Sequence, residues 1–295
     1  MKQEKEKKNK LRQYMMQYRR DPGSLIIRIV VLLGAFITVA SLVFLIAFIL
    51  INGIPHLKPS LFELDYTSEN VSMFPAIVTT IMITFLSLLI AAPIGIFSAV
   101  YLCEYANKNS KIVKVIRLAT ETLSGVPSIV YGLFGMLFFV TYLKWSFSLM
   151  AGAFTLSIMI LPLIMRTTEE ALQSVPNAQR EASFGLGAGK LITIFRIVLP
   201  SAIPGILAGV ILAVGRIVGE TAALIYTAGT VAQIPNSLFS SGRTLAIHMY
   251  ALSSEGFRTN ESYATAVILL LTVFLINTLS SFIAKRIRRK AYGKD

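Results

Sequence analysis

Two charged residues, Arg216 and Glu220, stand inside a long apolar stretch of this 295-residue chain. They are four positions apart, between runs rich in Ile, Leu, Val and Ala. On a continuous helix, residues four apart share a face, so the two side chains are predicted to point the same way. A planar guanidinium donates paired hydrogen bonds to carboxylate or phosphate oxygens. The pair therefore either neutralises itself or meets an anion.

The cost of placing these charges in a membrane favours a specific role for them. A charge at mid-bilayer costs about 2.5–3.5 kcal/mol on insertion scales. Structural pairing of Arg216 with Glu220 is one explanation, although arginine before glutamate is the less favourable order on a helix. The other explanation is a polar pathway beside Gly215 and Gly219, whose lack of side chains leaves room. Phosphate still carries a proton near neutrality, whereas sulfate does not, so Arg216 would attract phosphate while Glu220 accepts its hydroxyl or tempers its affinity.

A second candidate site lies in the polar stretch of residues 166–200. Pro176 can open a short helix there, because its missing N–H would be unpaired in the first turn anyway. Glu-Ala-Ser follows at residues 181–183, then Gly187, and then Ile-Val-Leu-Pro at residues 197–200. Gly187 can supply the turn that returns the chain to the membrane. Small residues on such a helix would allow close contact with a partner, and an ordinary connecting helix is the alternative.

The elements that position these residues are predicted to be membrane helices. Hydrophobic residues make up 55% of the chain and charged residues only 15%, and the mean hydropathy is +0.68. The apolar residues gather in runs near the ~20 residues that span a bilayer, where only a helix satisfies its own backbone groups. The predicted fold is an all-α polytopic membrane protein with six transmembrane helices, at residues 26–51, 74–101, 116–143, 147–165, 203–227 and 264–283.

The placement of basic residues predicts the orientation of these helices, because Lys and Arg concentrate in cytoplasmic segments. The net charge is +13, and most basic residues lie in residues 1–28, 102–117, 166–200 and 285–295. The opposite connections hold only Lys58, Lys144, Arg243 and Arg258. We therefore predict a multi-pass protein of the cytoplasmic membrane with both termini in the cytoplasm.

The predicted organisation has four parts, and no further globular domain is expected. They are a basic cytoplasmic tail (1–25), a first helix with its external loop (26–73), a main transmembrane domain (74–284) that contains loop 166–200, and a second basic tail (285–295).

Several other classes of protein do not fit the sequence. The single Cys103 excludes an internal disulfide, and His56 and His248 lie far apart in sequence, so no metal site is predicted. Neither paired aspartates nor a Ser–His arrangement suits an intramembrane enzyme, so no catalytic residue is predicted. The chain has no Gly-x-x-x-x-Gly-Lys-Ser/Thr motif and cannot bind ATP through a P-loop. Its basic residues flank apolar runs, which argues against nucleic acid as a partner.

The motif in loop 166–200 resembles the EAA signature of ABC importer permeases. That signature reads Glu-Ala-Ala, three residues, Gly, nine residues, Ile, one residue, Leu-Pro, and the chain departs from it in having Ser183 for the second Ala. Residues 125–133, 166–172 and 215–222 add a resemblance to PstA-type phosphate-specific permeases, which extends over about residues 70–284.

This resemblance implies a type I, MetI-like permease subunit of an ATP-driven phosphate importer, which is not itself an enzyme. Loop 166–200 would contain a coupling helix that docks on a separate PstB-type ATPase through Glu181, Ala182, Ser183 and Gly187. ATP and Mg²⁺ would belong to that ATPase, and this chain would bind no cofactor. A homologous PstC-type permease and an extracytoplasmic PstS-type phosphate-binding protein would complete the complex, with Arg216 and Glu220 lining the phosphate pathway in the lipid bilayer.

Two alternative functions remain open at this point. One is a permease for another oxyanion, such as phosphonate, sulfate or molybdate, against which Glu220 argues only in part. The other is a membrane scaffold or sensor, which would not require an ATPase-docking loop.

Overall fold

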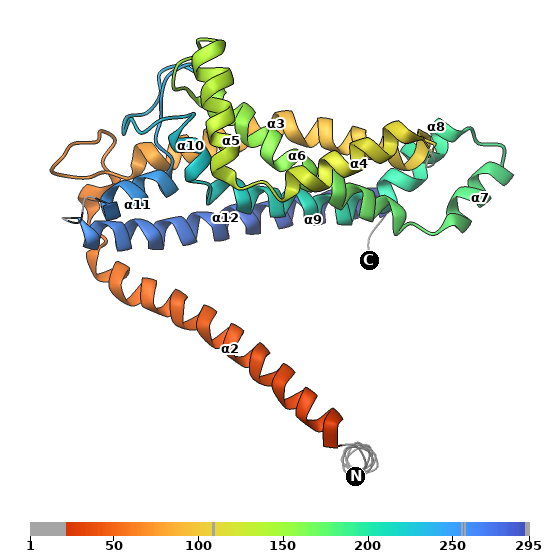
Figure 1. Ribbon diagram of the computed structural model, residues 1–295, viewed down its shortest axis with the longest axis horizontal. Helices are drawn as coiled ribbons and strands as arrows, with labels where there is room; N and C mark the ends of the chain where they lie inside the picture. The colour runs from red at the N-terminus through yellow and green to blue at the C-terminus, as the bar shows by residue number, and fades with distance from the viewer. Residues whose placement is uncertain (1–21, 108–109, 255, 257, 293–295) are drawn as a thin grey trace. The chain divides into compact units, whose positions relative to one another are not determined.

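The computed structural model describes residues 22–107, 110–254, 256 and 258–292, and the described chain is helical without β-strands (Figure 1). This confirms the all-α prediction. The chain forms two compact units, Met1–Asn52 and Gly53–Asp295. Most of the predicted basic tail 1–25 lies outside the described residues, whereas the backbone of the second predicted tail is helical as far as Tyr292.

The first unit consists of helix α2 (Pro22–Gly53), whose described side chains are almost all exposed. Large apolar residues such as Ile26, Phe36 and Phe44 are 62–70% exposed. A helix that is hydrophobic all round suits lipid or a second membrane protein rather than water. This helix matches the first predicted membrane span.

Five described helices, including α2, are long and apolar enough to cross a membrane, and a bent pair would make a sixth. The next such segment joins α3 (Phe74–Val100) to the π-helical turn η3 (Tyr101–Tyr105). The others are α6 (Leu149–Gln173), the run of α8 (Lys190–Thr193), η5 (Ile194–Val198) and α9 (Leu199–Val218), and α12 (Thr259–Tyr292). The multi-pass prediction is thereby confirmed.

The third predicted span, residues 116–143, is not one straight helix. Helix α4 (Lys111–Ser124) and the run of α5 (Ser128–Gly135) with η4 (Met136–Tyr142) meet at 104°. The break falls at Gly125-Val126-Pro127, where Pro127 is extended, with φ −60° and ψ 143°. Proline has no N–H to donate and disfavours the helical conformation in the residue before it, which explains why the helix ends there.

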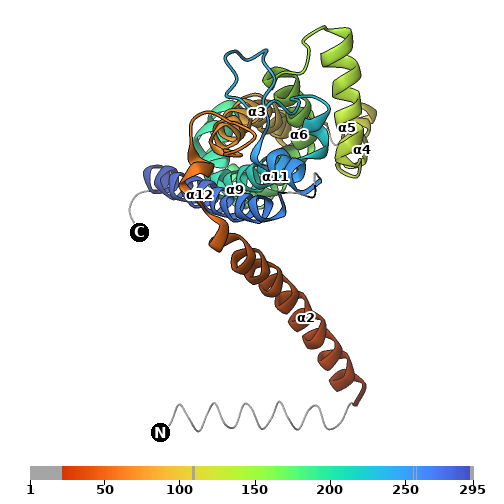
Figure 2. The ribbon, with the colours of Figure 1, turned by 90° about the vertical axis from the view of Figure 1, so that its left-hand side faces the viewer.

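The core of the second unit is built on α3, α6 and α9. Leu156 and Ile160 of α6 are fully buried against Ile83 of α3 and Ile217 of α9. Ser148 begins α6 by accepting a hydrogen bond from the Ala151 N–H at 3.2 Å. In the end-on view of Figure 2, α3 and α6 lie at the centre, with α9 and α12 on one side and α4 and α5 on another.

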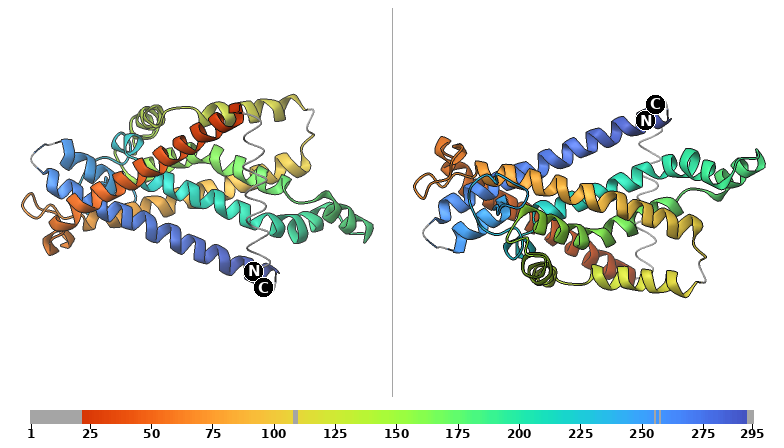
Figure 3. Two further views of the ribbon diagram at one scale, coloured as in Figure 1. Left: turned by 90° about the horizontal axis from the view of Figure 1, so that it is seen from below. Right: turned by 90° about the horizontal axis from the view of Figure 1, so that it is seen from above.

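Short helices occupy the two ends of the second unit (Figure 3). One end holds α7 (Asn177–Gly185) and α8, together with the start of α4. The other end holds η1 (Ile54–His56), η2 (Pro59–Phe62) and α11 (Leu245–Ser254). The loops predicted to be cytoplasmic thus share one end, and the connections 52–73 and 228–263 predicted to be external share the other. Which end faces the cytoplasm stays a prediction.

Candidate functional site

Arg216 and Glu220 do not lie on one continuous helix. Helix α9 ends at Val218, and α10 (Ala222–Ile225) begins only after Glu220. The expectation that spacing by four residues puts both side chains on one helical face was therefore wrong. Gly219 occupies the C-cap of α9, with φ −86° and ψ −3°.

The Glu220 carboxylate is buried and caps the next helix. Its side chain is 9% exposed, and Oε1 accepts a hydrogen bond from the Ala223 N–H at 3.1 Å. A carboxylate at this position satisfies an N–H that would otherwise lack a partner in the first turn of α10. The described part of the chain shows no second hydrogen bond to this carboxylate, so its other oxygen has no protein donor there.

Arg216 is partly buried, and the described residues provide no acceptor for its guanidinium. No ion pair joins it to Glu220, which weakens the explanation that the two residues merely neutralise each other. Tyr131 on α5 lies close enough to be influenced by the Arg216 charge. The Tyr131 hydroxyl donates to the Leu123 carbonyl of α4 at 2.7 Å, across the bend between the two helices.

The segment around Tyr131 is held against α10 by close backbone packing. A Cβ added to Gly132 would lie 2.8 Å from the Ala223 Cα, a distance that side chains do not tolerate. The helix that carries Tyr131 therefore contacts the helix that Glu220 caps. Sequence reasoning singled out residues 125–133 for their resemblance but missed this contact. Gly132 and the glycine–proline break before it are the features of the sequence that could have indicated this contact.

The residues predicted to dock the ATPase in loop 166–200 divide between the surface and the interior. Glu181 and Ala182 are exposed on α7, next to the exposed Phe184 and Leu186. Ser183 is only 3% exposed, and its hydroxyl lies 2.8 Å from the Thr193 hydroxyl of α8. Ser183 belongs to the predicted docking residues, but its side chain is therefore not accessible to a partner.

The predicted turn at Gly187 is present. This glycine has φ +82°, a conformation that residues with side chains rarely adopt, and it leads from α7 toward α8. The short helix predicted after Pro176 is also present, with Pro176 at its N-cap.

At the opposite end, Arg243 and His248 form a buried basic cluster that sequence reasoning did not single out. The Arg243 guanidinium carbon lies 4.9 Å from the centre of the Tyr66 ring, which His248 meets edge-on at 6.1 Å. The pKa of His248 is lowered to about 3, chiefly by burial and secondly by the Arg243 charge, against the opposing effect of a backbone hydrogen bond at Val71. His248 is therefore neutral at physiological pH and packs as an uncharged ring.

The described residues contain no candidate metal site beside these charged groups. No group of three or more His, Cys, Asp or Glu side chains is arranged to hold a metal within the described ranges. A polar pocket of about 170 Å³ lies at the Arg243 end, and its lining includes Lys58, Glu69, Asn70, Arg258 and Glu261. Its mixed charges give no preference for an anion.

The comparison that decides the family is a match over residues 91–291 to the model described as "Binding-protein-dependent transport system inner membrane component". The chain belongs to this family. It is thus an ABC importer permease of the MetI-like group, and the permease resemblance predicted from the EAA motif is confirmed. The scaffold or sensor alternative does not fit a transport subunit.

Curated relatives support this membership. The chain is 34% identical to the "Probable ABC transporter permease protein YqgI" of Bacillus subtilis, over 88% of this chain and 94% of the relative. It is 37% identical to the "Phosphate transport system permease protein PstA" of Pasteurella multocida, over 83% of this chain and 88% of the relative. The predicted resemblance to PstA-type permeases is confirmed by this and similar matches.

Solved structures confirm the fold. An inward-facing structure of the MetNI methionine ABC transporter matches with a TM-score of 0.57 at 20% identity, covering 73% of this chain and 94% of the other. A bacterial ABC transporter that imports the acidic polysaccharide alginate matches with a TM-score of 0.57 at 17% identity, covering 85% and 96%. These two transporters, named for methionine and for alginate, therefore share the fold of this chain.

Proposed function

We propose that this permease subunit conducts inorganic phosphate as part of an ATP-driven importer. The observation that carries the proposal is Arg216, a guanidinium without a protein acceptor among the described residues, two residues before a helix break. A partly buried cation without a partner is costly in a membrane, so a role in attracting an anion accounts for its presence. The phosphate-transport names of several relatives point to the same cargo.

Glu220 complements Arg216 in this proposal. One of its oxygens caps α10, which holds the carboxylate in place, and the other oxygen has no described donor. A protonated phosphate oxygen can donate to that oxygen while its anionic oxygens accept from Arg216. The carboxylate repels an oxyanion that has no proton, so sulfate is expected to be disfavoured.

We propose that the subunit works with the partners that its family membership implies. A homologous permease would complete the pathway, and an extracytoplasmic phosphate-binding protein would deliver the ion. A separate ATPase, carrying ATP and Mg²⁺, would dock on the exposed Glu181 and Ala182 of α7, with Gly187 shaping the loop. This arrangement requires α7 and both termini to be cytoplasmic, as the basic residues predict.

Uptake of labelled phosphate into vesicles containing the assembled complex tests the proposal. Arg216→Gln, Glu220→Gln and the double variant should each reduce uptake, by about 10-fold or more for Arg216→Gln because an ionic hydrogen bond contributes about 1.5–3 kcal/mol. Arg166→Gln is the matched control, since its side chain is 68% exposed in an i,i+4 pair with Glu170.

The same vesicles separate phosphate from the other oxyanions. Excess sulfate, molybdate or phosphonate is added during uptake, and only phosphate should compete strongly. Phosphate uptake that survives the double variant would remove the assignment of both residues. Strong competition by molybdate or sulfate would instead indicate a different oxyanion as the cargo.

A further inference from the structure

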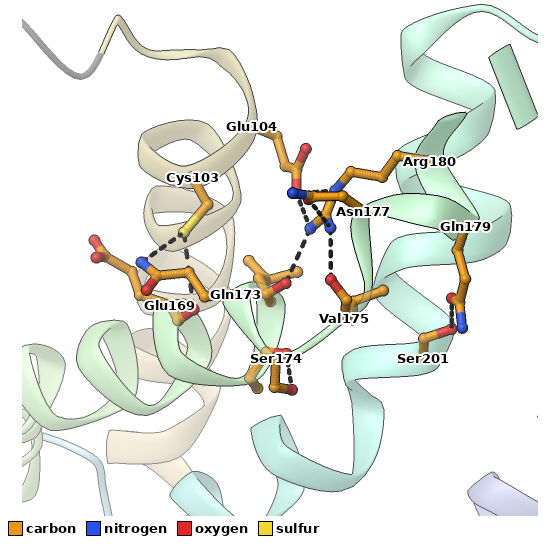
Figure 4. Close-up of polar contacts among 12 residues, drawn as sticks. Cys103, Glu104, Glu169, Gln173, Ser174, Val175, Asn177, Gln179, Arg180 and Ser201 are labelled. Atoms are coloured by element: carbon orange, nitrogen blue, oxygen red, sulfur yellow. Dashed lines mark hydrogen bonds and ion pairs between the residues drawn. The ribbon is translucent and has the colours of Figure 1, made fainter. Parts of the chain in front are cut away.

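Arg180 is the residue before Glu181 on α7, but it turns toward the protein interior. Its side chain is 17% exposed, whereas Glu181 lies on the surface. The guanidinium Nη2 donates to the Glu104 Oε1 at 2.8 Å, and Nε donates to the same oxygen at 3.3 Å. The Glu104 side chain is only 11% exposed, so this is a nearly buried ion pair (Figure 4).

Arg180 also binds carbonyls at the end of α6 and just beyond it. Nη2 also donates to the Leu172 carbonyl at 2.9 Å, and Nη1 donates to the Val175 carbonyl at 2.8 Å. Carbonyls at the end of a helix have no partner within it, and a cation there is favoured by the helix dipole. One side chain on α7 is thus joined to the end of α6 and to Glu104 (Figure 4).

Glu104 belongs to η3, which continues α3 without a break. Helix α3 packs along α6 in the core of the unit, so the carboxylate sits at the end of a membrane-spanning element. Another described contact of α7 is weaker: Ser201 of α9 donates to the Gln179 side chain at 3.2 Å in an exposed setting. The charged link to α3 is shorter and better shielded from solvent than this neutral one.

We infer that the Arg180–Glu104 ion pair is the link through which movement of α7 is transmitted to α3, so that Arg180 is a positioning residue for energy coupling. The inference rests on the proposed docking of an ATPase on α7. A guanidinium that holds two carbonyls and a carboxylate at once has little freedom to rotate, because each bond restricts its orientation. Displacement of α7 therefore moves the end of α3 as well, unless the ion pair breaks.

The first test measures ATP hydrolysis and phosphate uptake together in vesicles containing the complete complex. Arg180→Lys keeps the charge but loses the planar fork, and Glu104→Gln removes the ion pair while leaving the carbonyl contacts of Arg180. Both should raise the ATP consumed per phosphate at least about fivefold, the lower end of typical coupling between sites. Glu104→Asp keeps the charge and should fall between Glu104→Gln and the unmodified chain.

A matched control is available at the same end of the molecule. Arg117 of α4 pairs with Glu169 of α6 at 3.5 Å, with side chains 42% and 16% exposed, and this pair does not involve α7. Arg117→Lys should leave the ratio of ATP to phosphate unchanged. Unchanged ratios in both Arg180→Lys and Glu104→Gln would overturn the inference. A parallel loss of hydrolysis and uptake at constant ratio would also overturn it, because that result indicates a purely structural role.

A second measurement does not depend on the cargo. Hydrogen–deuterium exchange is followed at residues 96–105 of the complex, before and after ATP is added with a hydrolysis-deficient ATPase. ATP should change exchange in the unmodified chain, and Glu104→Gln should abolish that change while the ATPase still co-purifies. Failure of phosphate uptake in the unmodified complex would refute the phosphate assignment alone, whereas an equal exchange response in Glu104→Gln would refute the link.

Discussion

Arg216 and Arg180 are both shielded arginines near helix ends, but their surroundings are opposite. Arg180 has a carboxylate and two carbonyls within 2.9 Å, while the described residues offer Arg216 no acceptor. A guanidinium with its hydrogen bonds satisfied holds elements together. One without an acceptor in its own chain is left to bind a group from outside it. Under the proposed function, the contrast separates a link between helices from a residue that meets the transported ion.

The largest expected difference is in stability. Arg180→Ala leaves the Glu104 carboxylate buried without its cation, which costs about 3–5 kcal/mol in comparable pairs. Arg216→Ala removes no described hydrogen bond and should leave the unfolding free energy unchanged or raise it, because the cost of an unpaired cation is removed. Thermal unfolding of the purified complex in detergent measures both. Equal destabilisation by the two substitutions would erase the contrast between these arginines.

The packing beneath Arg216 can be tested through Gly132. A leucine there would collide with the Ala223 backbone, and overpacking of this kind costs about 1–3 kcal/mol. Displacing α5 from α10 should also move Tyr131 away from Arg216, and phosphate uptake should fall. Gly34→Ala is the control, since nothing lies within 4 Å of its added Cβ. Normal uptake by Gly132→Leu would show that the pathway does not depend on this contact.

Substitutions in loop 166–200 should have smaller effects, and they distinguish residues that dock the proposed ATPase from residues that stabilise the fold. Ser183→Ala removes the hydrogen bond to Thr193, which contributes about 0.5–1.5 kcal/mol, so the unfolding temperature should fall slightly. Co-purification of the ATPase should persist, because Ser183 is buried. Glu181→Lys on the exposed face should have the reverse result, with normal stability and lost co-purification. If Ser183→Ala lost the ATPase while Glu181→Lys retained it, the ATPase would not dock on the exposed face of α7.

The smallest expected effect is a pH dependence at the other end of the molecule. His248 has a folded pKa of about 3, below the ordinary value of 6.5, chiefly because of burial. Acid therefore protonates the unfolded chain first, and stability from this group is present above pH 6.5 and lost as pH falls toward 3. His248→Gln should flatten the decline in unfolding temperature between about pH 7 and about pH 5. An identical slope in the variant would show that His248 does not contribute.

The positions of the membrane helices could be predicted from runs of apolar residues, but the residues at which the helices end could not. The predicted start of α6 at residue 147 differs little from Leu149, because a long apolar run specifies a membrane helix by itself. The predicted fifth span ran to residue 227, but α9 stops at Val218. Apolar character continues past that point, so hydropathy alone could not locate a break at which the Glu220 carboxylate accepts from the Ala223 N–H.

The sequence by itself determined that this is a multi-helix membrane permease with an EAA-type loop, since these properties reside in runs of apolar residues and in the contiguous motif at residues 181–200. Only the tertiary structure decided which charges are satisfied. Arg180 and Glu104 are 76 positions apart, and the Tyr131 hydroxyl binds the Leu123 carbonyl across the 104° bend between α4 and α5. Partners so distant along the chain meet through the packing of several helices at once, and no local pattern of residues records that packing.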